Sequence, residues 1–284
     1  MNSILRPKAT YPTYPAYNVG GYYLEEYFYK RWIEENPQVE RKYIDIFWTN
    51  IFCNNRFDGQ PYPDIQKELN VLDSSQTYFT VVHNDYGVLE NLPPNTIVFD
   101  AGGLNQQYES IPIPLICSRI PQHLIPRKEK TIFASFVGSS THKVRVDMYD
   151  HFHMVDGYQI HMDEWSVNIP DSAMNLFIET ACSSKFSLAP RGNGKGSFRL
   201  YEIMQLNSVP VVISDDHYLP WNDELNWNEF SVLINEDQIP HMDEILKTID
   251  DVKYQKMLET GKKVYEEYFT LEGMYNNILK RLNK

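Results

Sequence analysis

Short runs of β-branched and aromatic residues alternate along the chain with longer stretches in which hydrophobic residues recur at helical spacing. The short runs predict strands at residues 42–48, 78–82 and 97–99, from 131 onward, up to Pro190, and at 209–213. Helical spacing predicts helices over residues 21–36, 242–249 and 254–268. The first 20 residues are rich in proline and tyrosine and are expected to be extended. Strands that alternate with helices favour an α/β fold.

A proline-rich segment, residues 111–130, separates two such α/β stretches. Its prolines are Pro112, Pro114, Pro121 and Pro126. Proline interrupts helices and central strands, so the segment is expected to cross between two domains. A length of 284 residues suits one large domain or two ordinary ones. We predict an N-terminal α/β domain at 1–125, a C-terminal α/β domain at 126–250, and helices at 251–284 that pack back on the first domain.

Composition and charge exclude several classes of protein. Lys and Arg number 26 against 38 Asp and Glu, and the net charge of −12 argues against nucleic acid as a partner. Cys53, Cys117 and Cys182 lie far apart, which predicts free thiols in a reducing compartment rather than disulfides or a zinc site. No apolar run is long enough to span a membrane, and the start of the chain lacks the apolar stretch of a signal peptide. We therefore expect a soluble, cytoplasmic protein without a membrane anchor.

The segment from Ser184 to Glu202 carries the most specific chemical signal. A predicted strand ends at Pro190, a loop with three glycines follows, and a helix is predicted to begin near Ser197. Glycine lets backbone N–H groups approach a phosphate, and a helix N-terminus adds a partial positive charge. The loop also carries Arg191 and Lys195, so it predicts an anion site. Its glycine spacing is not that of a nicotinamide dinucleotide site.

A second buried strand follows this helix and ends at a pair of carboxylates. The strand covers residues 209–213, and Asp215 and Asp216 come directly after it. Strand, glycine loop, helix and strand together form one βαβ unit, with the loop at the carboxyl end of a strand. The two aspartates are expected either to contact the bound ligand or to cap the turn.

At this point the chain resembles the exostosin family of glycosyltransferases. The family shows a strand ending in Pro-x-Gly, then Ser-x-Arg-Leu with an acidic residue, a Pro-Val strand, an Asp, a Pro-aromatic step and a Trp-x-x-Phe-Ser-Val run. The matching segments here are Ser184–Gly192, Ser197–Leu200, Glu202, Asn207–Val211, Asp215, Leu219–Trp221 and Trp227–Val232. A weaker likeness begins near residue 75, where Asn84 replaces a family histidine while Asp85 and Gly87 match. Ser187 and Asn207-Ser208 also depart from the family pattern, at small-residue packing positions.

The resemblance implies a GT-B fold, in which two Rossmann-like α/β domains face a central cleft and a helical tail follows. It also implies an inverting transfer of sugar from a UDP-sugar to a glycan acceptor. Among such enzymes, the size and the missing anchor are similar to the soluble exostosin-like transferases of large algal viruses, one of which is a xylosyltransferase. We therefore expect xylose as the sugar and a glycan of a viral capsid glycoprotein as the acceptor. The alternative is a non-catalytic protein that binds nucleotide-sugars or glycans on the same scaffold.

The donor diphosphate needs positive charge as it leaves. The sequence contains no Asp-x-Asp motif, which metal-dependent transferases use to hold a divalent ion, so we expect no metal and no cofactor. Arginines and helix N-termini can supply the charge instead. The predicted donor-binding residues are Gly138, Arg145, Arg191, Gly192, Lys195, Ser197, Phe198, Arg199 and Glu202. For Glu202 we expect bonds to the ribose hydroxyls, or otherwise an ion pair with Arg199 on the same helix.

Inversion at the anomeric carbon requires one general base, which should lie on the first domain opposite the donor. Asp73 and Asp85 flank the predicted strand at 78–82 and are the leading candidates. The sequence does not decide between them, and the other carboxylates left open are Asp45, Asp58, Glu90 and Asp100. His151, His153 and His161 are expected to be solvated or packed rather than metal ligands, because a His-x-His pair on a helix points to different faces.

Overall fold

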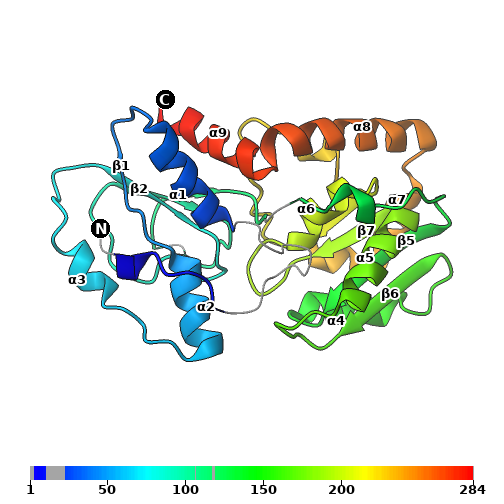
Figure 1. Cartoon of the computed structure of the whole chain (residues 1–284). Helices are drawn as coiled ribbons and strands as arrows, with labels where there is room; N and C mark the ends of the chain where they lie inside the picture. The colour runs from blue at the N-terminus through cyan, green and yellow to red at the C-terminus, as the bar shows by residue number, and fades with distance from the viewer. Residues whose placement is uncertain (1–2, 11–22, 106, 117–118, 284) are drawn as a thin grey trace.

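The computed structural model describes residues 3–10, 23–105, 107–116 and 119–283. Its strands form two separate sheets, which lie beside each other in Figure 1. The first sheet has the order β1-β2-β3-β4, with β1 (Lys42–Tyr43), β2 (Tyr78–Val82), β3 (Thr96–Asp100) and β4 (Ser110–Pro112). The second has the order β6-β5-β7-β8-β9, with β5 (Ile132–Ser139), β6 (Tyr158–Asp163), β7 (Ser184–Pro190), β8 (Val209–Ile213) and β9 (Val232–Ile234).

Helices connect and cover these strands. The first unit contains the first sheet with α1 (Leu24–Glu35), α2 (Trp48–Asp58) and α3 (Ile65–Leu69). The second unit contains the second sheet with α4 (Lys143–Phe152), α5 (Asp171–Ser183), α6 (Phe198–Gln205) and α7 (Met242–Lys247), and the chain continues into α8 (Asp251–Tyr268) and α9 (Leu271–Leu282). Short 3₁₀ helices lie at Ser3–Leu5, Gln122–Leu124, Trp227–Glu229 and Glu236–His241.

All neighbouring strands in both sheets are parallel. Both β2 and β8 are buried along their whole length, as expected for parallel strands that helices cover. The prediction of an α/β protein with two Rossmann-like units in the GT-B arrangement is therefore confirmed. Within the described ranges, none of the helices has both the length and the apolar character needed to cross a bilayer.

Most predicted elements are present. The strands expected at 78–82, 97–99 and 209–213 correspond to β2, β3 and β8, and the two expected C-terminal helices correspond to α7 and α8. The helix expected at 21–36 is α1, although residues 21 and 22 lie outside the described ranges. Cys53 and Cys182 are free thiols, as expected, whereas Cys117 lies outside the described residues.

Two local predictions are wrong. The strand expected at 42–48 ends at Tyr43, and Trp48 instead begins α2. The side chains of Ile44, Ile46 and Trp48 are buried, as they would be in a strand. The indole N–H of Trp48 donates to the Thr80 hydroxyl of β2 at 2.8 Å, which holds the start of α2 against the sheet. Near the start of the chain, which was expected to be extended, Ser3–Leu5 forms a 3₁₀ helix, and residues 11–20 lie outside the described part.

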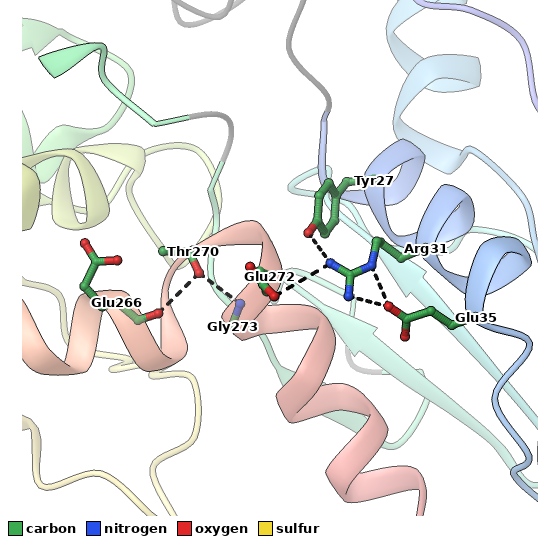
Figure 2. Close-up of polar contacts among 7 residues, drawn as sticks. All are labelled: Tyr27, Arg31, Glu35, Glu266, Thr270, Glu272 and Gly273. Atoms are coloured by element: carbon green, nitrogen blue, oxygen red, sulfur yellow. Dashed lines mark hydrogen bonds and ion pairs between the residues drawn. The ribbon is translucent and has the colours of Figure 1, made fainter. Parts of the chain in front are cut away.

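The last two helices tie the units together. In Figure 1, α8 runs along the second unit and α9 continues over the first, where it packs on α1. The rings of Phe28 and Tyr275 lie 5.1 Å apart between α1 and α9. Figure 2 shows the polar contacts at this junction: Arg31 of α1 approaches Glu272 of α9 at 4.0 Å, and the Thr270 hydroxyl caps the first turn of α9. The predicted domain boundaries at 125 and 250 stay a prediction.

The loops that follow β7 and β8 in the second sheet contact the first unit directly. The Lys195 N–H donates to the Gly102 carbonyl at 2.9 Å, and the Tyr218 hydroxyl donates to the Ser110 hydroxyl at 3.2 Å. Gly103 has a φ of 74°, and a Cβ there would lie 2.8 Å from the Tyr218 ring. Both the conformation and the close approach therefore require glycine at this position.

Candidate active site

The order of strands in the second sheet defines where a ligand would bind. From β5 the chain passes through α4 to β6 on one side, and then crosses to β7 on the other side of β5. In open parallel sheets, ligands bind at the carboxyl ends of the two strands where the order reverses. Here those strands are β5 and β7, so the expected site lies between the loop after Ser139 and the glycine loop after Pro190.

Arg145, in α4, joins these two loops. Its guanidinium donates to the carbonyls of Ser139 at 2.8 Å, Arg191 at 3.0 Å and Pro190 at 3.3 Å. The side chain is almost completely buried. A Cβ at Gly192 would lie 3.3 Å from the Arg145 guanidinium, so the missing side chain lets the loop pass close to the charge. Arg145 therefore holds the site together and brings a fixed positive charge to it.

Three buried polar atoms around the same loops have no hydrogen-bond partner among the described residues. They are the Thr141 hydroxyl, the Arg191 Nε–H group and the Ser197 hydroxyl. Ser197 precedes α6 but its side chain does not cap that helix. Since buried polar groups are nearly always hydrogen-bonded, three such atoms in these two loops indicate the place of a polar ligand.

Arg199 and Glu202 form an ion pair on α6. Arg199 also donates from Nε to the Val137 carbonyl at 2.8 Å and lies over the Phe177 ring at 4.0 Å. The alternative considered from the sequence, an ion pair within the helix, is thus the contact that the structure shows. Contact of either residue with the donor stays a prediction.

The other predicted donor residues have structural partners. Lys195 pairs with Asp216 at 2.5 Å, and Asp215 accepts a hydrogen bond of 2.7 Å from the Glu236 N–H, which corresponds to the capping alternative. The ring of Phe198 lies 5.4 Å from that of His83 in the first unit. A Cβ at Gly138 would lie 2.6 Å from the Phe136 ring, so this glycine serves packing under the loop.

Asp85 follows β2 in the first unit and is held by the glycine loop of the second. The Asn193 amide donates to its carboxylate at 3.2 Å, and the Gly194 N–H donates as well. A Cβ at Gly194 would lie only 2.5 Å from the Asp85 carboxylate, so this contact requires glycine. Burial raises the pKa of the Asp85 carboxyl, while the bonds from Asn193 and Gly194 lower it less. A raised pKa suits a carboxylate that takes a proton near neutral pH.

Asp73 lies at the other end of β2. It is exposed, and bonds from Ser75 lower the pKa of its carboxyl. Because β2 spans about 16 Å at the usual rise per residue, Asp73 and Asp85 lie near opposite ends of this strand, Asp73 near the amino end and Asp85 at the carboxyl end. Of these two candidates, Asp85 therefore lies beside the glycine loop and Asp73 does not. The role of either as a general base stays a prediction.

The remaining carboxylates considered from the sequence have partners within the first unit. Asp45 pairs with Arg6 at 2.8 Å, Asp58 accepts from the Thr10 hydroxyl at 2.6 Å, and Glu90 accepts from the Tyr62 hydroxyl at 2.9 Å. Asp100 accepts from two backbone N–H groups at the end of β3, and burial raises the pKa of its carboxyl to about 6.

The histidines show no common ligand set. His151 and His153 each bond a carbonyl of their own helix, and His161 bonds Gln159. In the part of the chain that the structure describes, no three His, Cys, Asp or Glu side chains gather as a metal site would require. Metal independence stays a prediction.

Glu25, in the first turn of α1, was missed from the sequence. Its buried carboxylate accepts bonds from the N–H groups of Thr49 at 3.0 Å and of His83 at 2.8 Å. Burial raises the pKa of this carboxyl to about 8, against the opposing hydrogen bonds. An acidic residue in a first helical turn usually lies in solvent beside the helix dipole, so the sequence contains no signal for this burial.

A raised pKa predicts that Glu25 makes the free energy of unfolding depend on pH. The folded protein holds this proton between pH 4.5 and about 8, whereas the unfolded chain loses it, so stability falls as pH rises through this range. Glu25→Gln should reduce that fall by a few kcal/mol, on the order of 1.4 kcal/mol for each pH unit. Urea unfolding between about pH 5 and pH 8 would measure it, with Asp73→Asn as a control that keeps the wild-type slope. An unchanged slope in Glu25→Gln would contradict the assignment.

A family model of the Exostosin GT47 domain matches residues 82–249, more than half of the chain. The chain belongs to the exostosin GT47 family. The matched segment contains Asp85, Arg145 and the whole glycine loop, whereas Asp73 and Glu25 lie before it. The part of the resemblance that concerns the family is therefore confirmed.

Relatives in this family are similar over part of their length. A probable glycosyltransferase of Arabidopsis thaliana is 33% identical over 135 residues, which cover 48% of this chain and 27% of that protein. The Exostosin-1 homolog of Caenorhabditis elegans is 27% identical over 133 residues, covering 44% of this chain and 35% of that protein. The chain thus matches about a third or less of the length of these exostosin relatives.

The solved structures to which this exostosin-family chain is similar have lower sequence identity than these relatives. TarM is 12% identical with a TM-score of 0.44, covering 77% of this chain and 52% of its own. Sucrose-phosphate synthase from Thermosynechococcus elongatus is 9% identical with a TM-score of 0.47, covering 90% of this chain and 76% of its own.

Proposed function

We propose that this protein transfers a sugar from a UDP-sugar to a glycan hydroxyl, with inversion and without a metal ion. The observation that carries the proposal is the group of unpartnered buried donors at Thr141, Arg191 and Ser197, beside Arg145 at the switch point of the second sheet. A diphosphate would satisfy these donors. Membership of the exostosin GT47 family supports the same activity.

The leaving group is stabilised by charge that is already in place. As the bond between the anomeric carbon and the diphosphate breaks, negative charge grows on the phosphate oxygens. Arg145, Arg191 and the N–H groups at the start of α6 would face that charge without moving far, and such preorganised donors lower the barrier. In this reading Glu202 and Arg199 keep α6 in position for the ribose.

Asp85 would take the proton from the acceptor hydroxyl as that oxygen attacks the anomeric carbon from the face opposite the diphosphate. In the structure the carboxylate is bonded to Asn193 and Gly194, whose donors also belong to the loop that would surround the phosphate. Donor binding would therefore draw these groups toward the phosphate and release Asp85. This links occupation of the donor site to activation of the base.

Ser197→Ala tests the diphosphate site with little risk to the fold, because the hydroxyl has no bond to lose. We expect unchanged thermal stability and a UDP dissociation constant about 10- to 100-fold higher, since a hydrogen bond to a charged group contributes about 1.5–3 kcal/mol. Calorimetric titration with UDP, with and without EDTA, would measure both the affinity and the absence of a metal requirement. Wild-type affinity in Ser197→Ala, or loss of UDP binding in EDTA, would contradict the proposal.

The proposal also names the sugar that is transferred and the acceptor that receives it. Resemblance to the soluble algal-virus transferases supports UDP-xylose as the donor, a capsid glycan as the acceptor and the cytoplasm as the place of action. Since UDP-xylose has the α configuration, inversion requires a β-xyloside as the product. NMR of the product would show this, whereas UDP binding without any transfer would favour the non-catalytic alternative.

A further inference from the structure

Asp100, the last residue of β3, carries a carboxylate that no step of the proposed transfer uses. The residue is only 1% exposed. One carboxylate oxygen accepts the Gly102 N–H at 2.8 Å, and the other accepts the Gly103 N–H at 3.2 Å. Burying a carboxylate costs free energy unless donors compensate it, and here both donors come from the short loop that follows the strand. Asp100 therefore fixes the backbone of residues 101–103.

The loop at residues 101–103 in turn supports Asp85. A Cβ at Gly102 would lie 2.4 Å from the Asp85 Cα and 2.4 Å from the Asn84 carbonyl oxygen, so the two backbones are in direct contact and only glycine fits. The Leu104 N–H, just after the loop, donates to the Asp85 carbonyl at 3.3 Å. The position of the Asp85 backbone therefore depends on the loop that Asp100 holds.

The same loop receives the glycine loop of the second unit. The Gly102 carbonyl accepts the Lys195 N–H at 2.9 Å. A Cβ at Gly194 would lie 3.0 Å from that carbonyl oxygen and 2.5 Å from the Asp85 carboxylate. A Cβ at Gly103 would lie 3.0 Å from the Lys195 side chain. Gly102 thus contacts both Asp85 and the glycine loop, so a shift of its peptide would displace the two relative to each other.

We propose that Asp100 is a positioning residue, whose ionised carboxylate fixes the peptides of Gly102 and Gly103 and thereby keeps Asp85 aligned with the glycine loop. Both carboxylate oxygens have to accept a hydrogen bond for this. An amide would present a donor to one of the two N–H groups, and a protonated carboxyl accepts more weakly, so either change loosens the loop. Describing Asp85 as a base rests on the proposed function, whereas its alignment with the glycine loop does not.

Titratable groups from three loops face Asp100: Asp85 after β2, Lys195 in the glycine loop with its partner Asp216, and Tyr218 after β8. Burial raises the pKa of the Asp100 carboxyl to about 6; the two glycine N–H bonds lower it, the Asp85 charge raises it and the Lys195 charge lowers it. Burial raises the pKa of the Tyr218 hydroxyl, which therefore stays neutral. Asp100 is thus ionised at pH 7 and mostly protonated at pH 5, where the alignment should loosen.

Amide hydrogen exchange tests this alignment without any substrate. Exchange of the Gly102, Gly103 and Lys195 N–H groups would be followed in the full chain at pH 7 and pH 5, with the intrinsic dependence of exchange on pH divided out. In Asp100→Asn at pH 7 we expect these amides to exchange about 10- to 100-fold faster than in wild type, because one hydrogen bond to a charged group is lost. Wild type at pH 5 should approach the variant, and the variant should show no further change between the two pH values.

Asp250→Asn is the matched control. The Asp250 carboxylate also accepts a backbone N–H at 2.8 Å, that of Lys253, but at the start of α8, where the next residue pairs with Lys185 near the amino end of β7. This variant should keep wild-type exchange at the three amides. Wild-type exchange in Asp100→Asn, equally fast exchange in Asp250→Asn, or an effect of pH that persists in full in Asp100→Asn would overturn the proposal. If Asp100→Asn does not fold, wild type decides alone, because equal exchange at pH 5 and pH 7 would also overturn it.

Sugar transfer is measured separately, so that the two proposals can fail independently. Asp100→Asn should transfer sugar at least about tenfold more slowly than wild type at pH 7, because a displaced base loses rate steeply. Its rate should also fall less from pH 7 to pH 5, since only Asp85 of the two carboxyls is left to titrate. The expected exchange without any transfer by wild type would refute the proposed transferase and keep the positioning role of Asp100. Transfer by wild type with unchanged exchange in the variant would refute only the positioning role.

Discussion

Asp85→Asn is expected to lower the rate of sugar transfer by about 10²- to 10⁴-fold, the usual contribution of a general base. The amide keeps the size of the side chain and can still contact Asn193, but it cannot take a proton. UDP affinity should be unchanged or tighter, because the glycine loop loses a charged competitor for its N–H donors. Transfer from UDP-xylose to the acceptor, followed as release of UDP, would measure the rate, and titration would measure the affinity.

Asp73→Asn is the matched control for this prediction. It makes the same change of carboxylate to amide beside the same strand, β2, but near the amino end of that strand and in solvent. We expect its transfer rate to stay within about twofold of wild type, since exposed substitutions away from a site rarely change it more. Full activity of Asp85→Asn, or inactivity of Asp73→Asn, would contradict the assignment of the base.

The second large effect is expected for Arg145→Lys, which keeps the charge but removes the fork of donors that holds three carbonyls. The free energy of unfolding should fall by about 3 kcal/mol, because buried carbonyls lose charged donors. The UDP dissociation constant should rise at least tenfold, because the loops after β5 and β7 lose their common anchor. Urea unfolding and calorimetric titration would measure the two effects.

Arg41→Lys is the control that separates the loss of stability from the loss of UDP affinity. Arg41 also donates to two backbone carbonyls, those of Tyr78 and Asn95, but at the amino ends of the first sheet. This variant should lose stability and keep wild-type UDP affinity. If Arg145→Lys bound UDP as tightly as wild type, the placement of the diphosphate beside Arg145 would be wrong.

The parts of the site that depend on neighbouring residues in the chain could be predicted from the sequence. The strand ending at Pro190, the glycine loop, the helix after Ser197 and the strand at 209–213 are local patterns, and the structure contains each of them. The same local reasoning extended the strand at 42–48 too far, because buried hydrophobic positions continue past the end of β1 into α2. Hydrophobic periodicity reports burial, not hydrogen bonding between strands.

The parts that depend on contacts between distant segments could not be predicted. Arg145 meets carbonyls 45 and 46 residues away only because β7 lies beside β5, and no local pattern specifies that order. Glu25 is buried because α2 and the end of β2 pack on its helix turn. The choice between Asp73 and Asp85 depends partly on local sequence and partly on contacts between distant segments. Asp73 precedes and Asp85 follows one predicted strand, so the sequence already places them at opposite ends of that strand, and ligands bind at the carboxyl end in parallel sheets.

The most direct test of the account is a crystal structure with UDP bound in the absence of divalent ions. We expect the diphosphate between the loops after β5 and β7, within hydrogen-bonding distance of the Ser197 hydroxyl and next to the Arg145 guanidinium, with Asp85 released from Gly194. A diphosphate bound away from residues 139–145 and 191–199, or bound only when a divalent cation bridges it to the protein, would contradict the central claim.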